Sequence, residues 1–141
     1  MSARAFIDTN VFVYAFEGTS PNKQIRARNL IGELVAQGRG VISGQIVQEF
    51  VNVMIRRFPS AMSRADLRLY SERIFQPLIQ AFSVLDLLDN ALDLRNRYQF
   101  PWYDSLIVAA ALQARCEILY SEDFQDGLRI DTMIVRNPFA G

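Results

Sequence analysis

The chain has 141 residues, half of them hydrophobic, and it carries 15 basic and 15 acidic side chains. That length suffices for one domain with a full core, so we expect a single domain over residues 1–141. The absence of histidine excludes Ser-His-Asp and Cys-His catalysis and histidine-ligated zinc. The one cysteine, Cys116, excludes an internal disulfide and a multi-cysteine zinc site, and we expect it to be inert core. Any catalysis must then use carboxylates, hydroxyls, amides or arginine.

Charge is unevenly distributed along the chain. Residues 1–80 hold ten basic and six acidic side chains, whereas residues 81–141 hold five and nine. Fourteen of the cations are arginine, which suits phosphate groups, although an arginine-rich composition alone gives the same count. No apolar run approaches the ~18–20 residues of a membrane span, and the start MSARAF lacks the apolar segment of a signal peptide. We therefore expect a cytoplasmic protein without a membrane segment.

The first part of the chain alternates between strand and helix signals. Residues 3–8 predict a strand that ends at Asp8. Ser20-Pro21 predicts the start of a helix, because proline is favoured in the first helical turn. Gly38 and Gly40 end this helix, and residues 41–42 predict a short second strand.

Two helices are expected next. The first begins at Ser43 and runs to about Phe58, where Pro59 stops it. The second begins at Ser63, for which Asp66 can serve as a capping-box partner.

The rest of the chain repeats the alternation. We expect helices at 87–98 and 104–115, and strands at 82–85, 118–120 and 133–135. Strands that alternate with helices imply a parallel sheet covered on both faces. The predicted fold class is therefore α/β, with one parallel sheet flanked by helices.

Two acidic side chains lie in apolar segments of the first half. Asp8 ends the first strand in A-F-I-D-T-N-V-F-V-Y, at the sheet edge where open α/β sheets bind ligands. Its alternative role is an Asx-turn with Asn10. Glu49 shares a helix face with Ile46 and Val53, where an acid is usually paired or functional, unless it reaches water at the boundary.

The second half supplies two more acids. Asp104 opens the most apolar helix, where it can cap the helix or, at the positive end of the dipole, bind a metal ion. The segment Y-S-E-D-F-Q-D-G follows a buried strand and offers Glu122, Asp123 and Asp126 as candidates for the fourth acid, or a solvated loop. Strand ends and helix starts meet at one edge of a parallel sheet, so we expect these carboxylates to converge.

Converging carboxylates require compensation. Like charges raise one another's pKa, and a divalent cation removes the conflict. Oxygen ligands without cysteine or histidine point to Mg²⁺ or Mn²⁺. Such an ion can activate water and hold a phosphodiester.

Four segments together resemble the PIN domain, and more narrowly the VapC-like toxins of bacterial toxin–antitoxin pairs: F-I-D-T-N, Q-E-F, W-Y-D-S-L-I-V-A-A-A-L and L-Y-S-E-D-F-Q-D-G. The resemblance spans nearly the whole chain. It implies a parallel sheet of about five strands and an endoribonuclease dependent on Mg²⁺ or Mn²⁺. It also implies a small antitoxin partner that covers the active cleft, and a homodimer.

The resemblance assigns roles to individual residues. It implies that Asp8, Glu49 and Asp104 are metal-site acids, with Asp123 at the fourth position. Asp126 leaves that fourth assignment open. The supporting polar positions implied are Asn10, Thr9 and Ser121.

Four arginines are candidates for RNA contact: Arg56, Arg57, Arg64 and Arg68. Their contribution would be electrostatic and sensitive to salt, with a solvated helix face as the alternative. Rival functions are a catalytically silent RNA- or antitoxin-binding module of the same fold, an aspartyl-phosphate hydrolase and a structure-specific DNA nuclease. The hydrolase is disfavoured because Asn10 occupies the place of its second acid and Lys23 is the one lysine.

Overall fold

The computed structural model describes residues 3–140, which form a five-stranded sheet in the order β2-β1-β3-β5-β4. Neighbouring strands are parallel from β2 to β5, and β4 is antiparallel to β5. The strands are β1 (Ala5–Ile7), β2 (Gly40–Val41), β3 (Ile118–Tyr120), β4 (Arg129–Ile130) and β5 (Met133–Arg136). The predicted α/β fold, a parallel sheet of about five strands flanked by helices, is confirmed, except that β4 is antiparallel.

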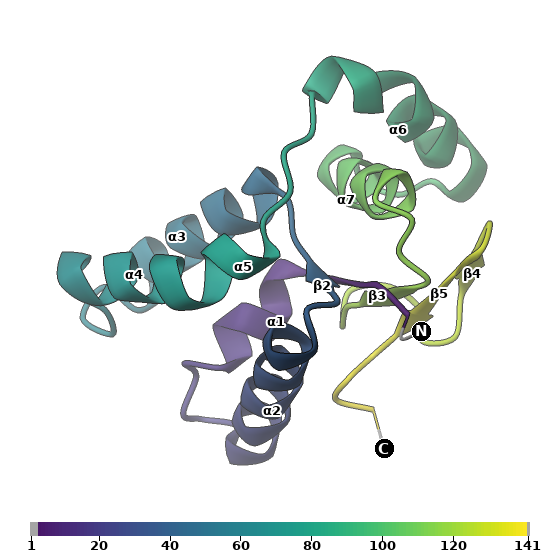
Figure 1. Cartoon of the computed structure of the whole chain (residues 1–141). Coiled ribbons are helices and arrows are strands. Elements are labelled where there is room, and N and C mark those ends of the chain that lie inside the picture. Colours follow the sequence, from purple (N-terminus) through teal and green to yellow (C-terminus); the bar gives the residue numbers. More distant parts are fainter. Residues whose placement is uncertain (1–2, 141) are drawn as a thin grey trace.

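Helices cover both faces of this sheet. Figure 1 shows α1 and α2 on one side of the strands, and α6 and α7 on the other. The helices are α1 (Thr9–Tyr14), α2 (Pro21–Gln37), α3 (Gly44–Arg57), α4 (Arg64–Tyr70), α5 (Gln76–Leu78), α6 (Val84–Tyr98) and α7 (Trp102–Gln113). Among residues 3–140, no helix has the length and apolar character needed to cross a bilayer.

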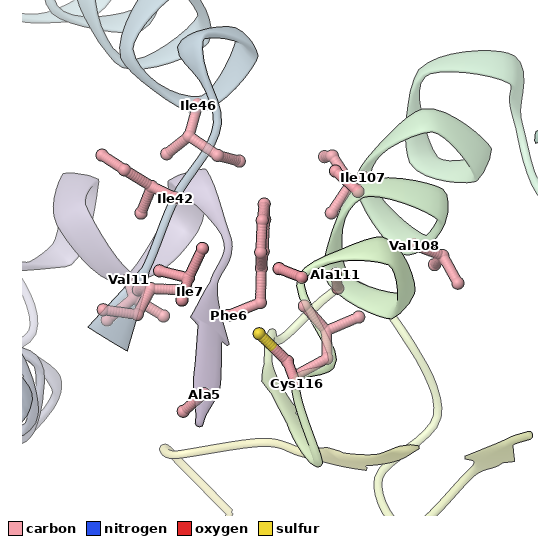
Figure 2. Packing of buried hydrophobic residues seen from close by; sticks show 14 of the residues in the cluster. Ala5, Phe6, Ile7, Val11, Ile42, Ile46, Ile107, Val108, Ala111 and Cys116 are labelled. Atoms are coloured by element: carbon pink, nitrogen blue, oxygen red, sulfur yellow. The ribbon is translucent and has the colours of Figure 1, made fainter. Parts of the chain in front are cut away.

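The central strand β1 contributes side chains to both layers of the core. In Figure 2, Phe6 extends between Ile46 of α3 and Ile107 of α7, whereas Ile7 lies beside Val11 of α1. All five of these side chains are buried. Burying an aliphatic or aromatic side chain of this size stabilises the fold by about 1.5–3 kcal/mol. This packing fixes the carboxyl end of β1, and with it the position of Asp8.

Cys116 behaves as the sequence predicts. It lies after α7, is buried in the core cluster and forms no disulfide. Burial raises the pKa of its thiol to about 11, so the thiol stays protonated at neutral pH.

The predicted strand at 82–85 is wrong. Residues 82 and 83 have no regular structure, and Val84 begins α6, which was expected to start at 87. Val84 and Leu85 belong instead to the first turn of a helix, in which Leu87, Ala91 and Leu94 recur at helical spacing and are buried. The segment that pairs beside β2 lies before residue 82: Ile79 forms an isolated parallel bridge with Ile42.

Two further elements were not predicted from the sequence. The helix that begins after Ser63 ends at Tyr70 and continues as a π-helical turn, Ser71–Phe75, before α5. The two-residue strand β4 pairs with β5 in the last hairpin, and such a short strand has too few residues to show an alternating pattern.

Candidate active site

Asp8 lies where β1 ends and α1 begins, and its side chain is 2% exposed. As the N-cap of α1, it accepts a hydrogen bond from the backbone N–H of Thr9 at 2.7 Å. Burial raises the pKa of Asp8 to about 7, and the charges of Asp123 and Glu49 add to the rise against the hydrogen bonds from Ser121 and Thr9. An acid with this pKa is only about half ionised at neutral pH, and a nearby cation would favour its charged form.

The loop after β3 reaches Asp8 through hydrogen bonds. Ser121, fully buried, donates its hydroxyl hydrogen to Asp8 Oδ2 at 2.7 Å. The amide of Asn10 donates to Asp123 Oδ2 at 3.1 Å and, more weakly, to Asp8 Oδ2 at 3.4 Å. The backbone N–H of Asp123 donates to Ser121 Oγ at 3.0 Å. Side chains from the two ends of the chain thus form one network at the carboxyl edge of the sheet.

Glu49 joins this network from α3. Its Oε1 accepts the hydroxyl hydrogen of Thr9 at 2.9 Å, and its Oε2 accepts from Gln45 Nε2 at 3.3 Å. Gln45 also donates to the backbone carbonyl of Tyr103 at 3.0 Å. The amide of Gln45 therefore links α3 to the first turn of α7, next to Asp104.

Asp104 is half-buried in that first turn. Burial raises its pKa, and the nearby charges of Asp123 and Glu49 raise it further. The helix dipole at this end favours a negative charge and partly offsets the rise. Asp104 thus shares an electrostatic environment with two acids from other elements.

Three of the predicted acids, Asp8, Glu49 and Asp123, line an acidic cleft of about 510 Å³, whereas Asp104 is not among its lining residues. Its lining includes Asp8, Asn10, Glu49, Arg57, Glu122 and Asp123. Of the four arginines predicted to contact RNA, all are exposed, and Arg57 lines the acidic cleft. Arg64 lines a separate groove with Phe58 and Leu67. The geometry therefore distinguishes Arg57 from the other three.

The three acids of the last loop have different surroundings. Asp123 lines the acidic cleft, whereas exposed Asp126 accepts from the backbone N–H of Asn137 at 2.8 Å and so holds the C-terminal segment. Glu122 is paired with Lys23 at 2.6 Å. Burial opposes ionisation of Glu122, but the bonds from Lys23 and Tyr14 outweigh it and hold its pKa below the usual range. The geometry favours Asp123 as the fourth acid.

The donor set fits a hard divalent cation in its chemistry. It consists of carboxylate, hydroxyl and amide oxygens without a thiolate or imidazole, and burial, together with the neighbouring acids, raises the pKa values of Asp8 and Asp104. Within residues 3–140, however, no three acidic or cysteine side chains are placed so that they could hold one ion together. The carboxylates must draw closer before they can share an ion.

Several contributors to the cleft were not predicted. Gln45 precedes Glu49 by four residues on α3, so helical spacing alone could have suggested their contact. Tyr14 and Lys23 contact Glu122 across 108 and 99 residues, and no local pattern signals such pairs.

Comparison with known proteins identifies the family of this chain. The family model for the PIN domain matches residues 5–126. A search of the curated proteins gives no match.

Solved structures of toxin–antitoxin proteins share the fold. A toxin–antitoxin complex from Klebsiella pneumoniae is 20% identical, with a TM-score of 0.69 over 96% of this chain and 98% of that one. VapBC2 from Rickettsia felis, bound to a promoter DNA fragment, is 19% identical, with a TM-score of 0.69 over 94% and 97%. VapC20 from Mycobacterium tuberculosis, a toxin that cleaves the sarcin-ricin loop, is 17% identical, with a TM-score of 0.62 over 84% and 89%.

The family model covers most of the chain, including the strand that ends at Asp8, the helix that carries Glu49 and the loop that carries Asp123. The protein belongs to the PIN domain family.

Proposed function

We propose that this protein is a Mg²⁺-dependent endoribonuclease, with Mn²⁺ as an alternative ion, and that it acts as the toxin of a toxin–antitoxin pair. The observation that supports this most is the buried Asp8 at the end of β1, whose pKa of about 7 reflects burial and the nearby acids Asp123 and Glu49. A metal-dependent nuclease needs acidic side chains near one another, and Asp8, Glu49 and Asp123 are neighbours that would share an ion after drawing closer.

The ion would be held by Asp8, Glu49, Asp104 and Asp123. When bound, it supplies an activated water and neutralises charge on the phosphodiester. The chain's own residues prepare the site: Ser121 and Asn10 orient Asp8 and Asp123, and Thr9 orients Glu49. Hydrogen bonds of this kind fix ligand direction and keep the carboxylates from rotating out of the cleft.

Arg57 is placed to bind the RNA backbone. It lines the acidic cleft together with Asp8 and Glu49, and its guanidinium lies 5.1 Å from the ring centre of Phe58. A cation at the mouth of an acidic cleft can hold a phosphate beside the scissile one without reading the base. Arg56, Arg64 and Arg68 stay predictions as RNA contacts, since they do not line the acidic cleft.

An antitoxin partner suits the charge of the cleft. One structural neighbour is a toxin–antitoxin complex from Klebsiella pneumoniae. In this chain, an arginine or lysine from a small partner could enter the acidic cleft and exclude both metal ion and RNA. The homodimer stays a prediction, which light scattering on the purified protein checks.

The test is cleavage of total RNA by protein purified free of any partner, with Mg²⁺ or with EDTA. We expect cleavage that EDTA stops and that Asp8→Asn abolishes. Asp89→Asn, which neutralises an exposed acid of α6, is the matched control and should cleave normally. Cleavage that survives both EDTA and Asp8→Asn would contradict the proposal, and RNA binding without cleavage would point to the silent module of the same fold.

A further inference from the structure

The one lysine of the chain lies beside the acidic cleft in a cluster that the proposed chemistry does not use. Lys23 of α2 donates to Glu122 Oε2 at 2.6 Å and to the hydroxyl oxygen of Tyr14 at 3.2 Å. Tyr14, at the end of α1, donates to Glu122 Oε1 at 2.8 Å. We name Lys23, Tyr14 and Glu122 the lysine clamp.

The lysine clamp occupies both carboxylate oxygens of Glu122. One oxygen faces a phenol and the other an ammonium group, so the charge of Glu122 is already compensated inside the protein. Although Glu122 lines the acidic cleft, it is therefore a poor candidate for metal ligation. Its carboxylate fastens the loop to α1 and α2.

This attachment lies within the loop that meets the other acids. Glu122 sits between Ser121, which donates to Asp8, and Asp123, which lines the acidic cleft. The backbone N–H of Glu122 donates to Asn10 Oδ1 at 3.2 Å. Two anchors thus hold residue 122, one through its backbone and one through its side chain, and its neighbours can move little.

The C-terminal segment packs against the same cluster. The ring of Phe139 lies edge-on to that of Tyr14, with their centres 4.8 Å apart, and Lys23 Nζ lies 4.5 Å from the centre of the Tyr14 ring. The side chains of Lys23 and Glu122 are 36% and 28% exposed, so solvent screens the ion pair and its effect on global stability is small. Its effect should instead be local, on the geometry of the loop.

We propose that Lys23 is a positioning residue, which acts through Glu122 to hold residues 121–123 so that Ser121 meets Asp8 and Asp123 faces the cleft. The inference rests on the proposed function, since it assigns a role in preparing the same metal site. It also explains why a cation lies beside a site that must bind another cation: Lys23 compensates the charge of Glu122, an acid of the loop that the site does not need.

Removing Lys23 has two opposite effects on cation binding. Loss of a positive charge makes the cleft more negative, which by itself strengthens the binding of a divalent ion. Loss of the anchor lets Asp123 move, which weakens it. The double variant Lys23→Met with Glu122→Gln separates these effects, because it removes the ion pair and leaves the net charge unchanged.

The first measurement is the rate of hydrogen exchange at the backbone amides of Glu122 and Asp123, which NMR monitors in the absence of metal ions. We expect exchange about tenfold faster in Lys23→Met and in the double variant. Lys23→Arg, which keeps the charge, should exchange close to the wild-type rate. Arg95→Met, which removes an exposed cation from α6, is the control for charge alone and should match the wild type. Unchanged exchange in Lys23→Met would overturn the proposal.

The second measurement is the affinity for Mn²⁺, by titration calorimetry. Positioning predicts binding about tenfold weaker in both Lys23→Met and the double variant, with recovery in Lys23→Arg. The opposite result is tighter Mn²⁺ binding by Lys23→Met together with wild-type affinity in the double variant. It would mean that Lys23 affects the ion only through its charge, and it would overturn the positioning role. If the wild type binds no Mn²⁺, the proposed nuclease function fails, while the exchange rates still decide whether the lysine clamp holds the loop.

Discussion

Thr9 donates its hydroxyl hydrogen to Glu49 Oε1 over 2.9 Å, so the residue that follows Asp8 also fixes the acid of α3. Thr9 is 9% exposed and begins α1 directly at the end of β1. A single short segment thereby places one carboxylate and aims a second that lies 40 residues away. The proximity of Asp8 and Glu49 follows from this link.

Thr9→Val should lower RNA cleavage by about 10–100-fold, because an isosteric side chain without a hydroxyl leaves Glu49 free to rotate away from the cleft. The loss should be largest at limiting Mg²⁺, as expected if metal affinity falls. Initial cleavage rates across a Mg²⁺ titration measure it. Thr9→Ser keeps the hydroxyl and should stay near wild type, and equal rates for Val and Ser would rule out a role for this bond.

Asp8→Asn should stabilise the metal-free protein at pH 8. The folded pKa of Asp8 is about 7 and lies above the ordinary value of 3.8, so the folded state binds more protons than the unfolded state between these values. Stability therefore falls as pH rises from about 4 to about 7, and the full cost of ionising the buried acid, on the order of 4 kcal/mol, applies above pH 7. Asparagine has no such cost.

Urea unfolding of both proteins in EDTA at pH 5 and pH 8 tests this dependence. The stability difference between Asp8→Asn and the wild type should be larger at pH 8. Added Mn²⁺ should stabilise only the wild type, because binding to the folded state alone raises the free energy of unfolding. A difference independent of pH would mean that Asp8 ionises as an exposed acid does.

The sequence predicted the parts of this site that depend on local signals. Asp8 follows a buried strand and Asp104 lies in the first turn of an apolar helix, which begins at Trp102 and not at Asp104 as predicted. The order of the parallel strands then brings the two segments to one edge. The strand expected at 82–85 was wrong because that prediction also used a local signal alone. A short apolar segment is equally typical of a buried strand and of the start of a helix.

The contacts between side chains were not predictable in this way. Asn10 reaches Asp123 across 113 residues, and Lys23 reaches Glu122 across 99. Such pairs depend on the register of the strands in the sheet and on the angle at which α2 packs. The spacing of apolar residues in the sequence predicts neither of these. The choice between Asp123 and Asp126 stayed open in the sequence because a surface loop can turn either acid inward.

Asp123→Asn should abolish cleavage, whereas Asp126→Asn should leave it nearly unchanged. The two acids lie three residues apart in one loop, but Asp123 lines the acidic cleft and Asp126 bonds the backbone N–H of Asn137. Loss of the latter bond should lower the melting temperature slightly, with no change in metal dependence. Cleavage assays and thermal melts of both variants test which of the two acids belongs to the site. An Asp126→Asn variant that has normal stability but no cleavage activity would reverse the assignment of the fourth acid.

Arg57→Ala should weaken RNA binding more than Arg56→Ala does. The two residues are neighbours at the end of α3, and both are exposed. Of the two, Arg57 lines the acidic cleft and Arg56 does not. If Arg57 contacts one phosphate, its loss should lower the slope of log affinity against log salt by about one and weaken binding equally for unrelated RNA sequences. Filter binding of Asp8→Asn protein, which cannot cleave the probe, measures both effects across a salt series. Equal losses for the two alanine variants would indicate a diffuse field from the helix end and no contact specific to Arg57.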